Sequence, residues 1–332
     1  MASKSKLKSI LKTTIPLVIG LGLVYYMLFY RMQPEERTSM FNSIKSANYW
    51  WIGLSLFLGI LSHASRAYRW KFMLNALGHK PKFWNSFYSV MIGYMMNLLV
   101  PRMGEVSRCV YFSKYEKISF EKTLGTVIAE RIADAIILLS LITITMILQY
   151  KLLFGLIENT IIGTAIQNPI IAILILLGFI LLAYIGVRII KTSKNKFISK
   201  IRGFVLGLLE GVQSILKMKK KGAFILHTIF IWSMYVSMFM VCFYCLPGLE
   251  DVSINGKMAG FVVGGIAVAT TNGGLGAYPA GIMAILALYG VDESLGGAFG
   301  WVAWSAQTLM LLLAGLLSIL LISLYNKKND AQ

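Results

Sequence analysis

The sequence is poor in charged, metal-binding and redox-active side chains. Asp, Glu, Lys and Arg make up 14% of its 332 residues, and there are three His and three Cys. A soluble globular domain normally carries about 25% charged residues, so this composition is not typical of that class. Hydrophobic residues reach 57%, and no polar segment remains that is long enough to fold as a soluble catalytic domain. The composition therefore predicts one integral membrane domain over residues 1–332.

Acidic residues are especially scarce. The chain has 14 of them against 32 Lys and Arg, which gives a net charge of +18. The basic residues crowd the ends of apolar segments, so we expect a membrane protein that follows the positive-inside rule and has no nucleic-acid partner. Residues 1–12 are basic, and residues 188–221 hold ten Lys or Arg but only one acid, Glu210. Both segments are predicted to be cytoplasmic, and the second to contain an amphipathic helix on the membrane surface.

Long apolar runs predict an all-α polytopic protein with about six full transmembrane helices. They fall at residues 14–30, 50–64, 123–148, 169–187, 223–245 and 298–325. With the basic N-terminus inside, the C-terminus is also expected on the cytoplasmic side of the cell's inner membrane.

The apolar segment 83–100 does not fit this count as a full crossing, because the basic loop 188–221 would then lie outside. Either 83–100 is a re-entrant hairpin, or the weaker run 152–166 is an extra span. We favour the hairpin, because Gly93, Asn97, Pro101 and Gly104 supply helix breakers and polar groups at the turn.

A second apolar segment, 257–290, is interrupted by the sequence TTNGGLGAYP. Its glycines permit positive φ angles, and Pro279 suits the start of a new helix. Two broken elements that enter from opposite faces are typical of transporters built from an inverted repeat, with a binding site near the membrane midplane. The sequence therefore predicts two re-entrant helical hairpins and an inverted repeat.

Three charged residues, Glu130, Arg131 and Asp134, lie inside the apolar segment 123–148. With a helical rise of about 1.5 Å per residue, Asp134 is roughly 16 Å from the start of this segment, near the middle of a bilayer. A charge there is costly against lipid, so each must face a partner or a water-filled cavity. We therefore predict that this helix carries the functional site.

The first broken element adds Asn97, Arg102, Glu105 and Arg108. If a helix resumes after Pro101, its three charged residues share one side. Two interpretations remain open. The arginines pair with the carboxylates of the apolar segment in a structural lock, or they hold a phosphate while the carboxylates face an amine.

Three motifs in this order resemble the lysylphosphatidylglycerol synthase transmembrane region, a flippase-like family also described as uncharacterised protein family 0104. They are NLLVPRMGEVSR at 97–108, ERIAD at 130–134 and NGGLG at 272–276, and the resemblance covers roughly residues 44–324. It implies transbilayer movement of an anionic or aminoacylated phospholipid, such as aminoacylated phosphatidylglycerol, by a chain that we expect to lack the family's cytosolic aminoacyltransferase domain. A separate transferase would then supply the lipid.

Some members of this family are linked to polyprenyl-phosphate sugar transfer. An integral membrane transferase or accessory protein that acts on such lipid-linked sugars is therefore the alternative, and a transporter is favoured over an enzyme. We expect Arg102 and Arg108 to bind phosphate and Glu130 and Asp134 to bind a cationic group. The remaining substrate-binding candidates are Asn97, Glu105, Arg131, Asn272, Gly273, Gly274 and Gly276.

No metal or cofactor site is expected. Cys242 and Cys245 form a C-x-x-C pattern inside an apolar helix, with no other Cys or His at metal-ligand spacing. We interpret them as a packed pair of thiols.

Overall fold

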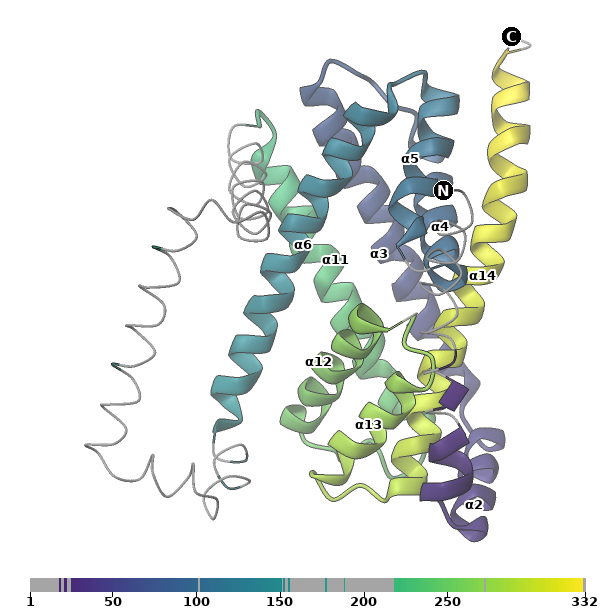
Figure 1. The fold of residues 1–332 in the computed structure, drawn as a ribbon, viewed down its shortest axis with the longest axis vertical. Coiled ribbons are helices and arrows are strands. Elements are labelled where there is room, and N and C mark those ends of the chain that lie inside the picture. The colour runs from purple at the N-terminus through teal and green to yellow at the C-terminus, as the bar shows by residue number, and fades with distance from the viewer. Residues whose placement is uncertain are drawn as a thin grey trace, which may run out of the picture. The chain divides into compact units, whose positions relative to one another are not determined.

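The computed structural model describes residues 18, 21, 22, 25–100, 102–150, 152, 155, 177, 188, 218–271 and 273–330. Every regular element in these ranges is a helix (Figure 1). The chain divides into two compact units, residues 1–130 with 218–332, and residues 131–217. About half of the predicted span 14–30, nearly all of the predicted span 169–187, the basic N-terminus and nearly all of the basic loop 188–221 lie outside the described residues.

The helices of the described ranges follow one another along the chain with short connections. The first part has η1 (Tyr26–Arg31), α2 (Pro34–Lys45), α3 (Tyr49–Ala76), α4 (Phe83–Leu99), α5 (Met103–Glu116) and α6 (Phe120–Leu148). The second has α11 (Lys221–Cys242), η2 (Phe243–Cys245), α12 (Ile254–Thr270), α13 (Ala277–Ala287) and α14 (Glu293–Asp330).

Three helices of the described part are long and apolar enough to cross a membrane. They cover Phe120–Leu148, Lys221–Cys245 and Glu293–Lys327, and they match the predicted spans 123–148, 223–245 and 298–325. The predicted span 50–64 is only part of a longer helix, because α3 runs for 28 residues without a break. The all-α membrane architecture is thus confirmed.

The first broken element is an antiparallel helical hairpin made by α4 and α5. Near its tip, the Asn97 side chain accepts a hydrogen bond from the Gly104 backbone N–H at 2.7 Å. At its open end, Asn85 donates to Glu116 at 2.6 Å. Between these points the backbones approach so closely that a Cβ on Gly93 would lie 2.9 Å from the Gly104 carbonyl oxygen. The predicted re-entrant segment 83–100 is itself one continuous helix, and Gly93 does not break it but allows the two arms of the hairpin to touch.

The second broken element is another antiparallel hairpin, made by α12 and α13. A Cβ on Gly264 would lie 2.6 Å from the Tyr278 ring, and one on Gly260 would lie 3.8 Å from Ile282 Cδ1. As the residue number falls along α12 it rises along α13, so the arms run in opposite directions. Small residues on α12 make room for large side chains on α13.

The tip of the second hairpin has the backbone that its glycines were predicted to allow. Gly273, Gly274 and Gly276 have φ angles of 64°, 80° and 71°, a region where a side chain would be strained. Trp304 on α14 donates a hydrogen bond from Nε1 to the Gly273 carbonyl oxygen at 2.7 Å. This bond fixes the tip against the long C-terminal helix.

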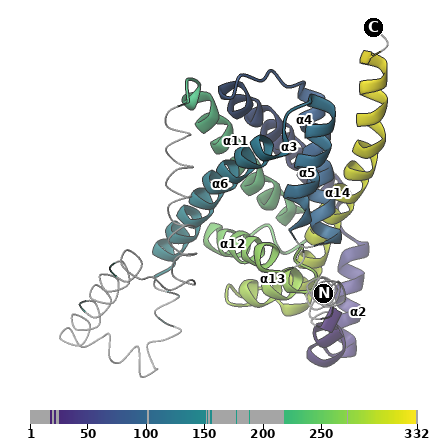
Figure 2. The same ribbon diagram turned by 45° about the horizontal axis from the view of Figure 1, so that its top comes forward.

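The two hairpins approach from opposite ends of α14 (Figures 1 and 2). Asn326, near the C-terminal end of α14, donates to Asn85 at the start of α4 at 2.7 Å. At the other end, a Cβ on Gly300 would lie 2.8 Å from Pro279 in the first turn of α13. The hairpin tips meet between these points, where a Cβ on Gly273 would lie 2.7 Å from a Leu98 methyl group.

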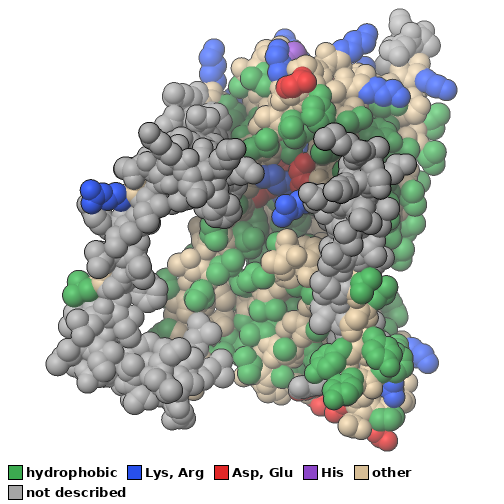
Figure 3. Space-filling model, viewed as in Figure 1, with side chains coloured by type: hydrophobic (Ala, Val, Ile, Leu, Met, Phe, Trp, Pro, Cys, Tyr) green, Lys and Arg blue, Asp and Glu red, His purple; other side chains and the backbone are tan. Residues whose placement is uncertain are grey.

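Charge distributes unequally between the two ends of this unit. Helices α3 and α11 pack antiparallel, with Ser55 bonded to the Met238 carbonyl at 2.9 Å, so the end of α3 and the start of α11 lie together. At that end, called the basic end below, lie Lys71, Lys80, Lys82, Lys114, Lys117, Lys122, Lys219, Lys220, Lys221 and Lys327. The basic end also holds Glu116 and Glu121, and the opposite end carries Glu35, Glu36, Glu250, Asp251, Asp292 and Glu293 together with Arg37, Lys45 and Lys257. In Figure 3 most of the blue side chains lie at the top of the molecule, whereas red ones are seen at the top, in the centre and at the bottom.

Helix α14 begins at an aspartate cap. The Asp292 carboxylate accepts hydrogen bonds from the backbone N–H groups of Ser294 at 2.9 Å and Leu295 at 3.2 Å, and also from the Ser294 hydroxyl. The hydroxyl is the largest cause of a lowered Asp292 pKa, aided by the backbone donors and opposed by partial burial. The carboxylate form is thus favoured in the folded protein.

We expect Asp292→Ala to cost about 1 kcal/mol of stability at neutral pH, the usual value of such a cap. Because the folded pKa is lowered, this stabilisation is present above the ordinary Asp pKa of about 3.9 and is lost as pH falls through the folded value. Thermal unfolding of purified protein in detergent, repeated between neutral and acidic pH, measures the difference. Asp251→Ala, at the same end, is the control. An effect of Asp292→Ala that persists at the lowest pH would contradict the role of the charge.

Candidate functional site

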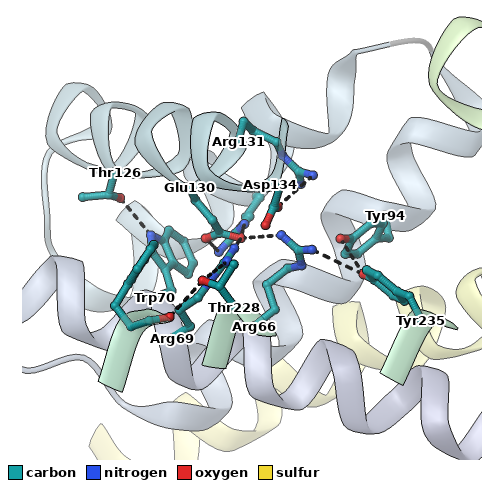
Figure 4. A network of polar contacts seen from close by, with 12 residues as sticks. Arg66, Arg69, Trp70, Tyr94, Thr126, Glu130, Arg131, Asp134, Thr228 and Tyr235 are labelled. Atoms are coloured by element: carbon teal, nitrogen blue, oxygen red, sulfur yellow. Dashed lines mark hydrogen bonds and ion pairs between the residues drawn. The ribbon is translucent and has the colours of Figure 1, made fainter. Parts of the chain in front are cut away.

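The centre of the site is one buried carboxylate contacted by three buried arginines (Figure 4). Glu130 is 0% exposed. Its Oε1 lies 2.8 Å from Arg66 Nη1 and 3.2 Å from Arg69 Nη2. Arg108 forms a fork, with Nη1 at 3.2 Å from Oε1 and Nη2 at 2.9 Å from Oε2. The arginines are exposed by at most 2%. We call these four residues the arginine cluster.

Three helices bring the arginine cluster together. Arg66 and Arg69 are three residues apart on α3 and therefore share one face, while Arg108 is on α5 and Glu130 on α6. Arg66 lies ten residues before the end of α3, and Glu130 ten residues after the start of α6. With a rise of about 1.5 Å per residue, the cluster is about 15 Å along these helices from the basic end.

Trp70 holds the Arg108 guanidinium in place. The guanidinium carbon lies 3.8 Å from the centre of the indole ring, a cation–π contact. Trp70 is 0% exposed, and its Nε1 donates to Thr126 Oγ1 at 2.8 Å. Phe112 packs on the indole with ring centroids 4.2 Å apart. These contacts hold the indole ring in one orientation, and the ring in turn positions the Arg108 guanidinium.

Polar side chains of α11 and α4 complete the surroundings of the cluster. Arg69 Nη1 donates to Thr228 Oγ1 at 2.8 Å, and Arg66 Nη2 lies 3.4 Å from the Tyr235 hydroxyl. That hydroxyl is 3.2 Å from the Tyr94 hydroxyl. The arginines on α3 thus each contact the Glu130 carboxylate and a hydroxyl group of α11.

The cluster carries an excess of positive charge. Counted over these four residues alone, three guanidiniums and one carboxylate give a formal net charge of +2. Burying unbalanced charge is unfavourable, and the cost falls when a counter-ion is present. Guanidinium groups match the geometry of phosphate and carboxylate oxygens. The arrangement is therefore suited to binding an anion.

Arg131 and Asp134, the next charged residues along α6, belong to the second unit. They lie 4.0 Å apart, at the outer limit of an ion pair. The Arg131 side chain is 37% exposed and that of Asp134 is 10% exposed. Residues three apart share one face of a helix, so the positions of Arg131 and Asp134 on α6 allow them to pair.

The other predicted site residues occupy the hairpin tips. Arg102 is exposed and precedes α5 in a left-handed conformation with a φ of 62°, so it does not share the helix face of Glu105 and Arg108. Glu105 is half-buried. Asn97 is bonded within the hairpin, and the predicted glycines form the second tip. Asn272 lies outside the described residues.

Sequence reasoning missed most partners of Glu130. Arg66 and Arg69 are not among the site residues expected from the sequence, because the predicted span 50–64 ends before them. In the structure α3 continues past both residues and buries them. Their three-residue spacing among small residues, with Ser62 and Ser65 on neighbouring positions, was the available signal for a buried polar face.

The described residues contain no group of three or more His, Cys, Asp or Glu that could hold a metal ion. Cys242 and Cys245 are buried and free of disulfides.

Comparison with known proteins gives two matches. The family model described as the lysylphosphatidylglycerol synthase TM region matches residues 14–315. A "UPF0104 membrane protein" of Methanocaldococcus jannaschii is 32% identical over 133 residues. That alignment covers 39% of this chain and 38% of the relative, so the similarity spans well under half of either protein. No solved structure matches.

Proposed function

Because the chain belongs to the lysylphosphatidylglycerol synthase transmembrane-region family, we propose that it moves a phosphate-bearing lipid across the membrane. The observation that carries the proposal is the arginine cluster, a buried group of net positive charge among apolar helices. A lipid headgroup needs a polar route through the protein while its tails remain in the bilayer. Buried charges in membrane helices commonly mark such a route.

In this proposal the arginines, rather than the carboxylate, contact the headgroup. Arg66, Arg69 and Arg108 bind the phosphate oxygens, because planar guanidiniums donate paired hydrogen bonds to them. Both oxygens of Glu130 already accept from arginines. Glu130 therefore positions the guanidiniums instead of receiving a cationic group of the substrate, which revises the role expected from the sequence.

The two hairpins supply a means of access from either side. Their tips meet at Leu98 and Gly273, and they approach from opposite ends of α14. Separation of the tips, with one hairpin moving at a time, would open a path to one face while the other stays closed, as in alternating access. The inverted repeat remains a prediction.

The basic end is assigned to the cytoplasm. Most of the described lysines lie there, and the positive-inside rule then places both the start of α4 and the end of α14 on the cytoplasmic side. In a bacterial-type cell this corresponds to the inner membrane. The aromatic side chains Trp50 and Trp84, exposed by 75% and 47%, suit the two membrane–water interfaces.

The test uses purified protein in vesicles that contain acyl-chain-labelled lipids with natural headgroups. Loss of label to a membrane-impermeant reductant measures transbilayer movement. We expect movement with the native protein and about tenfold or slower movement with Arg108→Gln, which corresponds to about 1.4 kcal/mol on the barrier. Lys114→Gln, which removes an exposed positive charge from the same helix, is the matched control.

A double variant separates a binding site from a structural lock. Arg108→Gln with Glu130→Gln removes Arg108 together with the carboxylate that it shares with Arg66 and Arg69, so the double variant is compared with Glu130→Gln alone. If Arg108 only locks Glu130 in place, the double variant should be at least as stable as Glu130→Gln and should move lipid at least as fast. If Arg108 binds the headgroup, the double variant should move lipid more slowly than Glu130→Gln. No lipid movement by folded native protein would overturn the proposal and favour the lipid-linked sugar transferase.

A further inference from the structure

We propose that Arg102 is a second contact for the lipid phosphate, separate from the arginine cluster and further from the basic end. It holds the headgroup on the part of the route between the cluster and the opposite face of the membrane. This inference rests on the proposed function, because it adds a binding residue to the same lipid route. It follows from the backbone conformation, the exposure and the depth of Arg102.

The backbone at Arg102 has a conformation that glycine normally provides. Arg102 directly precedes α5 and has a φ angle of 62°. The equivalent position at the tip of the second hairpin, directly before α13, is occupied by Gly276 with a φ angle of 71°. Glycine adopts such an angle without strain, whereas a residue with a Cβ does not. The turn therefore explains the positive φ angle of Arg102 but not the choice of arginine.

Comparison with the other helix ends makes Arg102 unusual. Lys117, which also has a positive φ angle of 55°, follows the last residue of α5, and a left-handed residue is common at that end of a helix. The residue before a helix usually has an extended backbone, as Gln33 and Asn48 do before α2 and α3. Strain at a non-glycine residue is typical of positions whose side chain has a function.

Arg102 lies deep in the membrane domain, yet its side chain is exposed. Helix α5 has 14 residues between the tip and the base of the hairpin, so Arg102 is about 21 Å along this helix from the basic end. Its guanidinium makes no ion pair or hydrogen bond with the described residues. A charge at this depth is unfavourable against lipid, so it requires water or an anionic ligand.

Arg102 and the arginine cluster are placed to contact a headgroup in succession. Arg108 lies six residues further along α5, which separates the two positions by about 9 Å along the helix. Both guanidiniums can donate paired hydrogen bonds to phosphate oxygens. Arg108 is held in place by Glu130 and Trp70, whereas the exposed side chain of Arg102 at the hairpin tip is able to follow a headgroup that leaves the cluster.

The first measurement compares lipid movement in vesicles that contain acyl-chain-labelled phosphatidylglycerol or phosphatidic acid. We expect about tenfold slower movement with Arg102→Gln, and a loss of about threefold or less with Arg102→Lys, which keeps the charge. Lys117→Gln removes an exposed charge from the other end of α5 and should move lipid at the native rate. Native-rate movement in Arg102→Gln would overturn the inference and leave the proposed function to the cluster alone.

Glycine variants exclude a folding defect as the cause of slow movement. Arg102→Gly and Lys117→Gly both relieve a strained backbone, so each should raise the unfolding midpoint in detergent by about 1–3 °C. Only Arg102→Gly should also slow lipid movement, again by about tenfold. A variant that is more stable than the native protein but slower would show that the arginine serves the substrate. Native-rate movement in Arg102→Gly would contradict this role.

Lipid binding distinguishes Arg102 from the cluster. Thermal stabilisation by phosphatidylglycerol or phosphatidic acid in detergent gives an apparent affinity, which we expect within about twofold of the native value in Arg102→Gln and at least about tenfold weaker in Arg108→Gln. An equal loss in both variants would place Arg102 in the site of the cluster and overturn a separate contact. No lipid movement by folded native protein would instead contradict the proposed function, and this inference with it.

Discussion

Glu130→Gln is expected to destabilise the protein by about 3–5 kcal/mol, the usual cost of removing one partner from a buried ion pair. The substitution preserves the shape of the side chain but removes the negative charge that contacts three buried arginines. The guanidiniums then repel one another in a region from which water is largely excluded. Unfolding of the purified protein in detergent, followed by temperature or denaturant, measures the loss.

Two further variants make this result interpretable. Glu121→Gln changes an exposed glutamate at the start of the same helix, and we expect it to have little effect. Adding Arg69→Gln to Glu130→Gln removes one of the repelling charges and should recover part of the lost stability. If Glu130→Gln is as stable as the native protein, the arginines are hydrated or neutralised by another anion, and the carboxylate is not their necessary counter-ion.

Much of the fold could be predicted because its signals are local. Apolar runs mark the crossing helices, and breakers such as Gly273 and Gly276 mark the tip of the second hairpin. The relation between the hairpins is not local. It depends on the contact between Leu98 and Gly273, residues that are far apart in the sequence, and on the continuous α14 that passes both hairpins.

The site could be predicted only in part, for a similar reason. Glu130 attracts notice because it interrupts an apolar segment, whereas Arg66 and Arg69 lie in a stretch with other basic residues. A basic stretch at the end of a span normally faces water or headgroups. Here the span continues, and Thr228 on a distant helix supplies a partner for Arg69. Only the packing of α3 against α11 distinguishes these arginines from surface anchors.

Gly104→Val is expected to disrupt the first hairpin and, through it, the arginine cluster. A Cβ at this position would overlap the Gly93 carbonyl oxygen and the Asn97 side-chain amide. The neighbouring backbone cannot yield as a flexible side chain can, so α5 must move away from α4. We expect a loss of about 3 kcal/mol or more, comparable to severe overpacking. Since Arg108 is one turn further along α5, its fork to Glu130 should also be lost.

The matched control is Gly125→Ala on α6, where a Cβ would meet nothing within 4 Å. Replacing an unconstrained helix glycine normally stabilises by about 0.5–1 kcal/mol, so the two substitutions should shift the unfolding midpoint in opposite directions. The stability of Gly104→Ala should fall between those of Gly104→Val and Gly125→Ala. Its rate of lipid movement should nevertheless be strongly reduced, because a small displacement of α5 is enough to separate Arg108 from Glu130. Native stability and native movement in Gly104→Val would mean that the two arms of the hairpin need not touch. The arginine cluster would then be held together by α3 and α6 rather than by the hairpin, and a hairpin that carries no part of the site's geometry could not gate access to it.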